Sequence, residues 1–334
     1  MKTLFWTLLL CVALNASAQT IEDADNAFRQ EDYKTASSLY EQLANKGDAK
    51  AQLALGLMFQ DGIGVTKNYF EALSWLNKAS NQGLADAQNA LGRFFLSSES
   101  MPDRNRAAAT WFRAAAKQGH GQAQLSMGLM HLEGKGVQQD YKLAAVFLRQ
   151  AADQGVPHSE VNLGNLYAEG RGVSQDFTQA ALLFRSASDK GERAAQVRLG
   201  VLYEDGKGVR KDYKEAASLY QLATNAGSLA AQNRLGLLYE TGKGVAKDYK
   251  QALQHYTEAA ELGYSYAQHN LCRMYTQGLG VTKNFQDAYF WCLLGSSDGS
   301  SAAVTLRDLL EKSLTPAQVA SAQSSARGWS PKVH

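Results

Sequence analysis

The chain has 334 residues, of which 45% are hydrophobic and 20% are charged, and its formal net charge is +2. This length is sufficient for a large hydrophobic core. A charge balance so close to neutrality is not typical of proteins that bind nucleic acid or anionic membranes, so we expect neither as a partner.

Residues 1–18 have the features of a secretory signal peptide. Lys2 supplies the positive charge, residues 4–14 form the apolar stretch, and residues 16–18 (Ala-Ser-Ala) are the small residues typical of a cleavage site. The apolar stretch is shorter than the roughly 18 residues needed to span a bilayer. We therefore predict cleavage after Ala18, a periplasmic or secreted location, and no membrane insertion of the mature chain.

A unit of 36 residues recurs without insertion from residue 51 onwards. Such a fixed period is typical of repeat arrays, in which stacked units share one continuous core. We expect residues 19–50 to form an incomplete repeat that caps the array, and residues 302–334 to form a C-terminal helical cap and tail. Residues 51–301 comprise seven repeats, at 51–86, 87–122, 123–158, 159–194, 195–230, 231–266 and 267–301.

The first half of each repeat predicts a helix, as the repeat at 195–230 illustrates. From residue 195 to about 205, Leu199, Leu202 and Tyr203 fall at helical spacing on one face. Gly200 lies among them, where the missing side chain allows another helix to approach closely. The glycines at 206 and 208 then end the helix, because glycine adopts the left-handed backbone conformation readily.

The second half predicts a second helix. Asp212 is placed to cap it, and Glu215, three residues later, would complete a capping box. Gly227 turns the chain into the next repeat. The predicted buried residues of this helix are Tyr213, Ala216, Ala217, Tyr220 and Ala223.

The repeats follow the pattern A-x-x-x-L-G-x-x-Y-x-x-G-x-G-V-x-x-D-x-x-x-A-x-x-x-Y-x-x-A. This pattern resembles the Sel1-like repeat, a relative of the tetratricopeptide repeat, and the resemblance covers residues 21–329. The helix pairs by themselves predict an all-α solenoid. The resemblance adds that this solenoid is a right-handed superhelix of stacked helix-turn-helix repeats.

Both ends and one internal turn depart from the pattern. Residues 21–29 predict a helix that covers the open end of the core. In the repeat at 87–122, Ser-Glu-Ser-Met-Pro (98–102) replaces the usual Gly-x-Gly-Val, so that Asp103 or Asn105 would cap the next helix. This turn is either a recognition loop or neutral variation in an exposed turn.

The C-terminal region predicts a flexible connection at 295–301 followed by two helices. An apolar face of Leu306, Leu309 and Leu310 marks the first of them. Thr315 would cap the second, with Pro316 at its first position.

The mature chain retains two cysteines, Cys272 and Cys292, both in the last repeat. An antiparallel helix pair that turns near Gly280 would place them nearly opposite each other, and an oxidising compartment favours a disulfide. A redox or metal-binding pair is the alternative, but no other cysteine or histidine is placed to support it.

No pattern in the sequence predicts catalysis, a metal site or a cofactor. The six histidines occupy unrelated positions in their repeats, and none forms a zinc-enzyme motif with a carboxylate. His131 stands where other repeats have Tyr or Phe, so we expect it in the core. Some cysteine-rich Sel1-like proteins have been associated with β-lactam binding, but they carry a cysteine pair in each repeat, unlike this chain.

The third, seventh and tenth residues of each repeat vary, yet they share one face of the first helix. By resemblance to the tetratricopeptide repeat, this face lines the concave surface that holds a peptide or a partner helix. The predicted partner-binding residues are Leu53, Leu57, Asn89, Arg93, Leu125, Leu129, Leu132, Asn165, Val201, Glu204, Asn233, Glu240, His269 and Arg273. The alternative is that the leucines pack inside a tight superhelix and bind nothing.

These observations together predict an exported, monomeric adaptor or regulator without catalytic activity, which binds a protein or peptide. A hydrolase or binding protein for cell-wall or β-lactam substrates is the alternative from another class. A sugar-binding scaffold is less favoured, because no aromatic residue occupies the third, seventh or tenth position.

Overall fold

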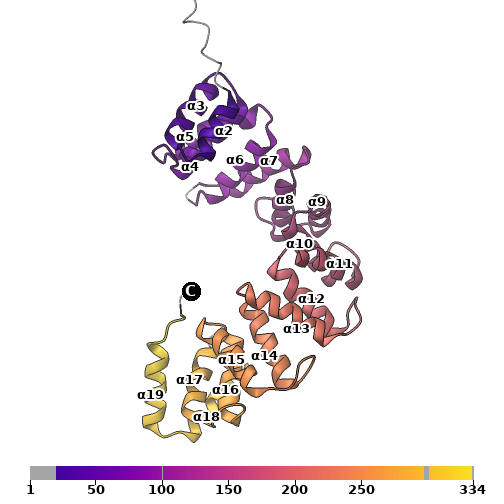
Figure 1. Cartoon of the computed structure of the whole chain (residues 1–334), viewed down its shortest axis with the longest axis vertical. Helices are drawn as coiled ribbons and strands as arrows, with labels where there is room; N and C mark the ends of the chain where they lie inside the picture. Colours follow the sequence, from indigo (N-terminus) through magenta and orange to yellow (C-terminus); the bar gives the residue numbers. More distant parts are fainter. Residues whose placement is uncertain (1–19, 100, 297–300, 333–334) are drawn as a thin grey trace, which may run out of the picture. The chain divides into compact units, whose positions relative to one another are not determined.

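The computed structural model describes residues 20–99, 101–296 and 301–332. Within these residues all regular secondary structure is helical, in eighteen helices labelled α2 to α19 (Figure 1). The predicted signal peptide and most of the predicted connection at 295–301 lie outside the described residues.

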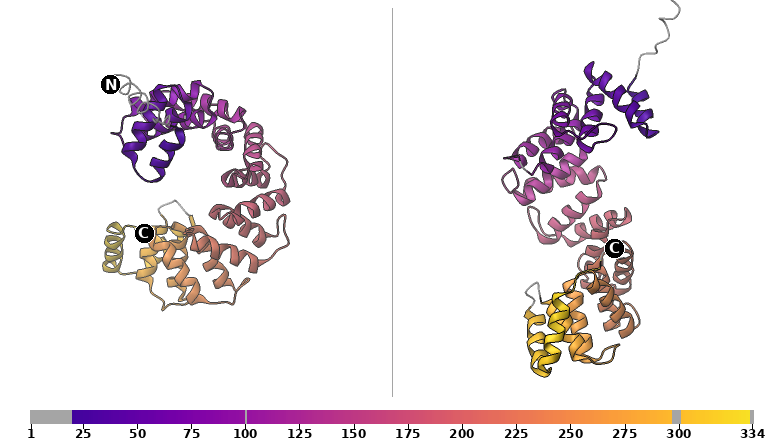
Figure 2. Two further views of the ribbon diagram at one scale, coloured as in Figure 1. Left: turned by 45° about the horizontal axis from the view of Figure 1, so that its top comes forward. Right: turned by 90° about the vertical axis from the view of Figure 1, so that its left-hand side faces the viewer.

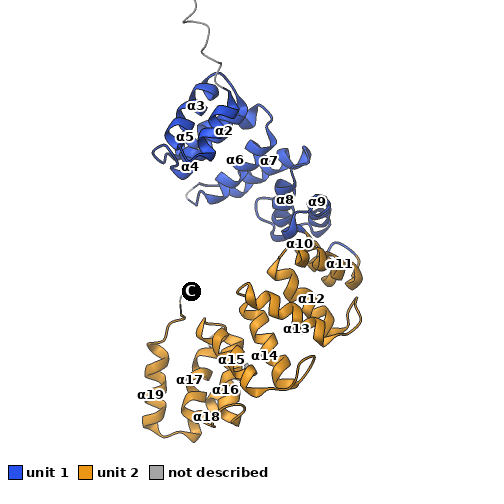
Figure 3. Cartoon of the chain, viewed as in Figure 1, with its two compact units in different colours: residues 1–159, 171–173 blue, residues 160–170, 174–334 orange. Residues whose placement is uncertain are grey.

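The chain falls into two compact units, residues 1–159 with 171–173 and residues 160–170 with 174–334 (Figure 3). The helices up to the boundary are α2 (Ile21–Arg29), α3 (Tyr33–Asn45), α4 (Ala49–Asp61), α5 (Tyr69–Asn81), α6 (Ala85–Ser97), α7 (Arg104–Lys117), α8 (Gly121–Glu133) and α9 (Tyr141–Asp153). Helix α10 (Pro157–Glu169) begins at the boundary.

The second unit continues with helices of similar length. They are α11 (Phe177–Asp189), α12 (Arg193–Asp205), α13 (Tyr213–Asn225), α14 (Leu229–Thr241), α15 (Tyr249–Glu261), α16 (Ser265–Gln277), α17 (Phe285–Gly295), α18 (Ser301–Ser313) and α19 (Pro316–Arg327).

Within each unit, consecutive helices pack as pairs that stack on one another. In the first unit α4 packs against α5, α6 against α7 and α8 against α9, and α5 and α7 each contact the next pair. In the second unit α12 and α13, α14 and α15, and α16 and α17 are paired in the same way. Each unit is thus built from helix pairs joined by turns (Figure 2), as the repeat period predicts.

The predicted cap at Asp212 is confirmed, but the capping box is wrong. The Asp212 side chain accepts hydrogen bonds from the backbone N–H groups of Lys214 and Glu215. A capping box would also need the Asp212 N–H, but that group donates to the Tyr203 carbonyl at 3.0 Å. Glu215 instead accepts from Arg185 of the preceding repeat at 3.1 Å.

The first helices begin two residues before the predicted start, and their glycines allow the close approach that was expected. A Cβ atom at Gly200 would lie 2.5 Å from the ring of Tyr220 on α13. Since a larger residue would collide with this ring, glycine sets the distance between the two helices of the repeat.

The turn between paired helices connects one repeat to the preceding one. Gly208 has a φ of 68°, and a Cβ atom there would overlap with the backbone carbonyl of Phe177, the first residue of α11. The same contact recurs at Gly64 on Tyr33, Gly136 on Asn105, Gly244 on Tyr213 and Gly280 on Tyr249. Each of these turns therefore docks on the start of the preceding second helix.

Buried glutamines also join successive helices in the first unit. Gln88 donates to the Ser80 carbonyl at 3.3 Å and accepts from Gln118, 30 residues later, at 2.8 Å. The pairs Gln52–Gln82 and Gln124–Gln154 repeat this arrangement. Gln196 is the corresponding glutamine in the second unit, but Ala226 stands 30 residues later, where the first unit has a donating glutamine. The buried Oε1 atom of Gln196 therefore has no partner among the described residues.

The departures from the repeat pattern have mixed outcomes. Asp103 occupies the N-cap position of α7, but its backbone is left-handed, with a φ of 55°, and its side chain makes no capping bond. At the C-terminus, Thr315 and Gln318 form a capping box on α19, as predicted for Thr315. Leu309 is exposed, so its predicted place on the apolar face of α18 is wrong.

The turn contact is tested by comparing two glycines. Gly191→Ala should cost about 1–2 kcal/mol, because its φ of 86° disfavours alanine although its surroundings are open. Gly208→Ala should cost about 1–3 kcal/mol more, because its Cβ atom also collides with backbone. Urea unfolding followed by circular dichroism measures both, and equal losses would contradict the docking role of the turn.

The unpaired Oε1 atom of Gln196 gives a second test. Ala226→Gln should raise the free energy of unfolding by about 0.5–1.5 kcal/mol, because it supplies the donor found in the repeats of the first unit. Ala226→Met is the matched control, since it adds a straight side chain without an amide. A gain of the same size in both variants would show that the hydrogen bond is not responsible.

Candidate partner-binding surface

The predicted face of the first unit contains a cavity between α4 and α6, called here the α4–α6 cavity. Its volume is about 380 Å³. Its lining includes Leu53, Leu57 and Asp61 of α4, Asn89 and Arg93 of α6, and His120 at the start of α8. The repeat positions chosen from the sequence therefore meet around one hollow in this unit.

An apolar cavity of about 280 Å³ adjoins it and shares Leu57 and Asp61. Phe28 of α2 and Tyr40 of α3 line its other side. Leu57 remains 36% exposed between the two cavities. The incomplete N-terminal repeat thus extends this surface. The choice of third, seventh and tenth positions did not detect it, because it was applied only to the seven full repeats.

A third cavity of about 370 Å³ lies between the end of α6 and helix α8, where Leu96 and Leu129 line it. Leu96 occupies a tenth position and is exposed, yet it was not among the predicted residues. The same holds for Leu237, at a seventh position of the second unit. Both leucines would have been predicted if every apolar residue at the third, seventh and tenth positions had been included.

Leu125 and Asn89 are more deeply buried than Leu57 or Leu132. Leu125 is only 4% exposed, so its side chain packs in the interior, whereas Leu132 is half-buried. Asn89 is 8% exposed, and its Oδ1 atom has no hydrogen-bond partner among the described residues. A buried carbonyl oxygen without a donor is costly, so Asn89 requires an explanation.

In the second unit, the polar residues of the predicted face bond to one another. Arg273 of α16 donates to both carboxylate oxygens of Glu240 on α14, at 2.6 and 2.5 Å. Arg234 of α14 likewise donates to Glu204 on α12 at 2.9 Å. These ion pairs join successive first helices, so their charges are largely neutralised within the chain.

Two buried tyrosines complete these ion pairs. Tyr220 donates to Glu204 at 2.7 Å and Tyr256 donates to Glu240 at 3.0 Å. Burial raises the pKa of both phenols well above the ordinary value, and the neighbouring carboxylates add to this effect. Burial opposes the charged form of Arg273, but its hydrogen bonds to Glu240 raise its pKa overall.

The other predicted residues of the second unit are not part of these ion pairs. Asn165, Val201 and His269 are half-buried. Asn233 accepts a hydrogen bond from Asn270 of α16 at 2.8 Å. Their contact with a partner stays a prediction.

Cys272 and Cys292 form a disulfide that joins α16 to α17, as predicted, with their Cα atoms 5.2 Å apart. Both residues are fully buried. Their repeat positions are those of Gly200 and Tyr220, so the disulfide replaces the contact between glycine and a large side chain that other repeats make. This placement indicates a structural bond.

The chemistry of the described residues gives no sign of a metal centre. No group of three or more His, Cys, Asp or Glu side chains comes together among them. His131 is buried and stacks on Phe147 with a centroid distance of 5.8 Å, which confirms that it belongs to the core.

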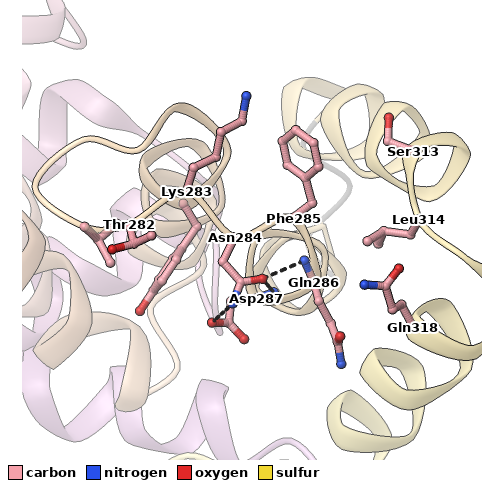
Figure 4. Close-up of a pocket in the computed structure, with 11 residues that line it drawn as sticks. Thr282, Lys283, Asn284, Phe285, Gln286, Asp287, Ser313, Leu314 and Gln318 are labelled. Atoms are coloured by element: carbon pink, nitrogen blue, oxygen red, sulfur yellow. Dashed lines mark hydrogen bonds between the residues drawn. The ribbon is translucent and has the colours of Figure 1, made fainter.

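A further cavity of about 580 Å³ lies at the C-terminal end of the second unit. There Phe285 and Gln286 of α17 face Leu314 and Gln318 (Figure 4). Two of its polar side chains already have partners within the chain, since Asn284 caps α17 and Gln286 donates to Ser321 at 3.3 Å. The α4–α6 cavity differs in this respect, because Asn89 lines it with an unpaired oxygen.

None of the helices in the described part of the chain is both long and apolar enough to cross a bilayer. The stacked helix pairs, with a hollowed face on the first helices, define the chain as an α-helical repeat protein.

The chain belongs to the Sel1 repeat family. The family model matches seven consecutive segments, at residues 49–84, 85–120, 121–156, 157–192, 193–228, 229–264 and 265–300. A search among curated proteins found no significant match.

Solved structures of Sel1 repeat proteins resemble this one. A protective antigen of uropathogenic Escherichia coli with an SLR fold is 25% identical, with a TM-score of 0.57, over 97% of this chain and 93% of that chain. A Sel1 repeat protein from Oxalobacter formigenes is 28% identical, with a TM-score of 0.65, over 72% of this chain and 97% of that chain.

The ion pairs of the second unit are tested by breaking one of them. Arg273→Met should lower the free energy of unfolding by about 2–3 kcal/mol, because it leaves the Glu240 carboxylate buried without its cation. Adding Glu240→Gln should restore much of the loss, since the amide removes the buried charge and can still accept from Tyr256. Urea unfolding measures the effect, and a double variant as unstable as the single one would contradict this account.

Proposed function

We propose that the chain is an exported, monomeric scaffold without catalytic activity, which binds a protein partner through the variable face of its first helices. Sel1 repeat proteins generally mediate protein–protein interactions and typically have no catalytic role. The variable face differs between the two units, and the first unit carries the features that favour binding.

The observation that carries the proposal is the exposure of large apolar side chains beside cavities. Leu57 and Leu96 remain exposed on this face and line hollows that neighbouring side chains do not fill. An apolar surface grouped around cavities is typical of an interaction site, whereas single exposed leucines are common on any protein. Stacked repeats also hold such a surface rigid, which lowers the ordering cost of binding.

Two features support export. Residues 1–18 have the sequence of a signal peptide. The buried disulfide between Cys272 and Cys292 favours an oxidising compartment, since thiols in the cytosol are kept reduced.

Replacing both exposed leucines tests this function. Leu57→Asp with Leu96→Asp should reduce capture of the envelope partner by at least about tenfold, because a charge on each apolar contact opposes desolvation. The measurement is crosslinking of the exported chain in its native envelope, followed by quantitative mass spectrometry of the captured protein.

Leu143→Asp on α9 is the matched control, because Leu143 is 44% exposed but lies on a second helix. It should leave capture unchanged. Circular dichroism and light scattering should show that all variants are folded monomers. Equal capture by the wild type and the double variant would refute the proposed surface.

A further inference from the structure

The α4–α6 cavity contains a polar group that the chain itself does not satisfy. The Oδ1 atom of Asn89 is buried without a partner among the described residues, and the side chain lines the cavity. A carboxamide carries the same kinds of donor and acceptor as a peptide group. It can therefore pair with the backbone of an extended polypeptide, whatever the side chains of that polypeptide are.

The equivalent residue in the second unit shows that an unpaired side-chain oxygen is not a general property of this repeat position. Asn233 occupies the same third position, four repeats after Asn89, and it accepts a hydrogen bond from Asn270 at 2.8 Å. The two residues have the same chemistry on the same helix face. Of these two, only Asn89 keeps its bonding capacity for a ligand.

Arginine shows the same contrast at the seventh position. Arg273 is bound to both oxygens of Glu240. Arg93 is exposed on α6 and has no hydrogen bond or ion pair with any described residue. Two carboxylates also line this cavity, but Asp86 lies 3.2 Å from His120 and neither Asp86 nor Asp61 pairs with Arg93. The guanidinium group of Arg93 is thus available for a ligand carboxylate.

Apolar side chains adjoin both the Asn89 carboxamide and the Arg93 guanidinium group. Leu53 and Leu57 line the same cavity, and Leu57 also lines the apolar cavity next to Phe28 and Tyr40. An apolar side chain of a ligand can enter there while its backbone reaches Asn89.

We propose that the α4–α6 cavity binds an extended segment of the partner polypeptide that carries an apolar residue close to an acidic one. Its backbone bonds to Asn89, its apolar side chain packs on Leu57, and its carboxylate pairs with Arg93. This inference rests on the proposed function and assigns the ligand class to one cavity.

The test uses a library of random dodecapeptides displayed on phage, which is panned against the full exported chain. The enriched peptides should combine apolar residues with Asp or Glu. Asn89→Leu should weaken binding of a labelled enriched peptide by about tenfold in fluorescence anisotropy, because it removes the bond to the peptide backbone. The same variant should unfold at an equal or higher temperature, since it removes a buried unsatisfied oxygen, which separates binding from folding.

Matched variants complete the design. Asn233→Leu changes the same repeat position where the amide is already bonded, so it should leave peptide affinity within about twofold of the wild type. Arg93→Glu should shift the enriched peptides from acidic to basic residues. Arg113→Glu, an equal charge change at an exposed position of α7, should not.

The outcomes separate this inference from the proposed function. Equal affinities for Asn89→Leu and the wild type, an unchanged charge preference in Arg93→Glu, or no enriched peptides at all would overturn the peptide site. Self-association of the chain that Arg93→Glu abolishes would overturn it too, because a second copy would then occupy the cavity. The envelope crosslinking experiment judges the proposed function independently, since it requires a captured protein but no extended peptide.

Discussion

The contact between each turn glycine and the preceding second helix is the constraint on which the array depends. At Gly208 the backbone of one repeat lies directly against the Phe177 carbonyl of the repeat before it, with no room for a side chain. Because this contact joins backbone to backbone, it fixes both the length of the turn and the spacing between repeats.

The fixed scaffold leaves the outward positions of the first helices free to differ, and the two units use this freedom differently. In the second unit, Glu240, Arg273 and Tyr256 form a network that joins neighbouring repeats. In the first unit, leucines surround cavities, and the Asn89 carbonyl oxygen and the Arg93 guanidinium are not bonded within the described chain. The same helix face therefore stabilises the array in one unit and is suited to a ligand in the other.

The last repeat shows how a new bond can replace a recurrent contact. Other repeats place a glycine of the first helix against a large side chain of the second, as Gly236 does with Tyr256. Here Cys272 and Cys292 occupy those two positions and are joined covalently. The disulfide thus secures the helix pair against which α18 and α19 pack.

The sequence by itself determined the helix pairs, their caps, the turn glycines and the cysteine pair, because each of these is set by residues close in the chain or by the repeat period. Tertiary structure alone decided which members of the variable face are free. Asn89 and Asn233 are indistinguishable in sequence position, and so are Arg93 and Arg273. Their difference arises from side chains about one repeat away, Asn270 and Glu240, which reach them only when neighbouring helices are stacked. The capping box at Asp212 was wrongly expected for the same reason, since the Tyr203 carbonyl that takes the Asp212 N–H comes from the folded turn.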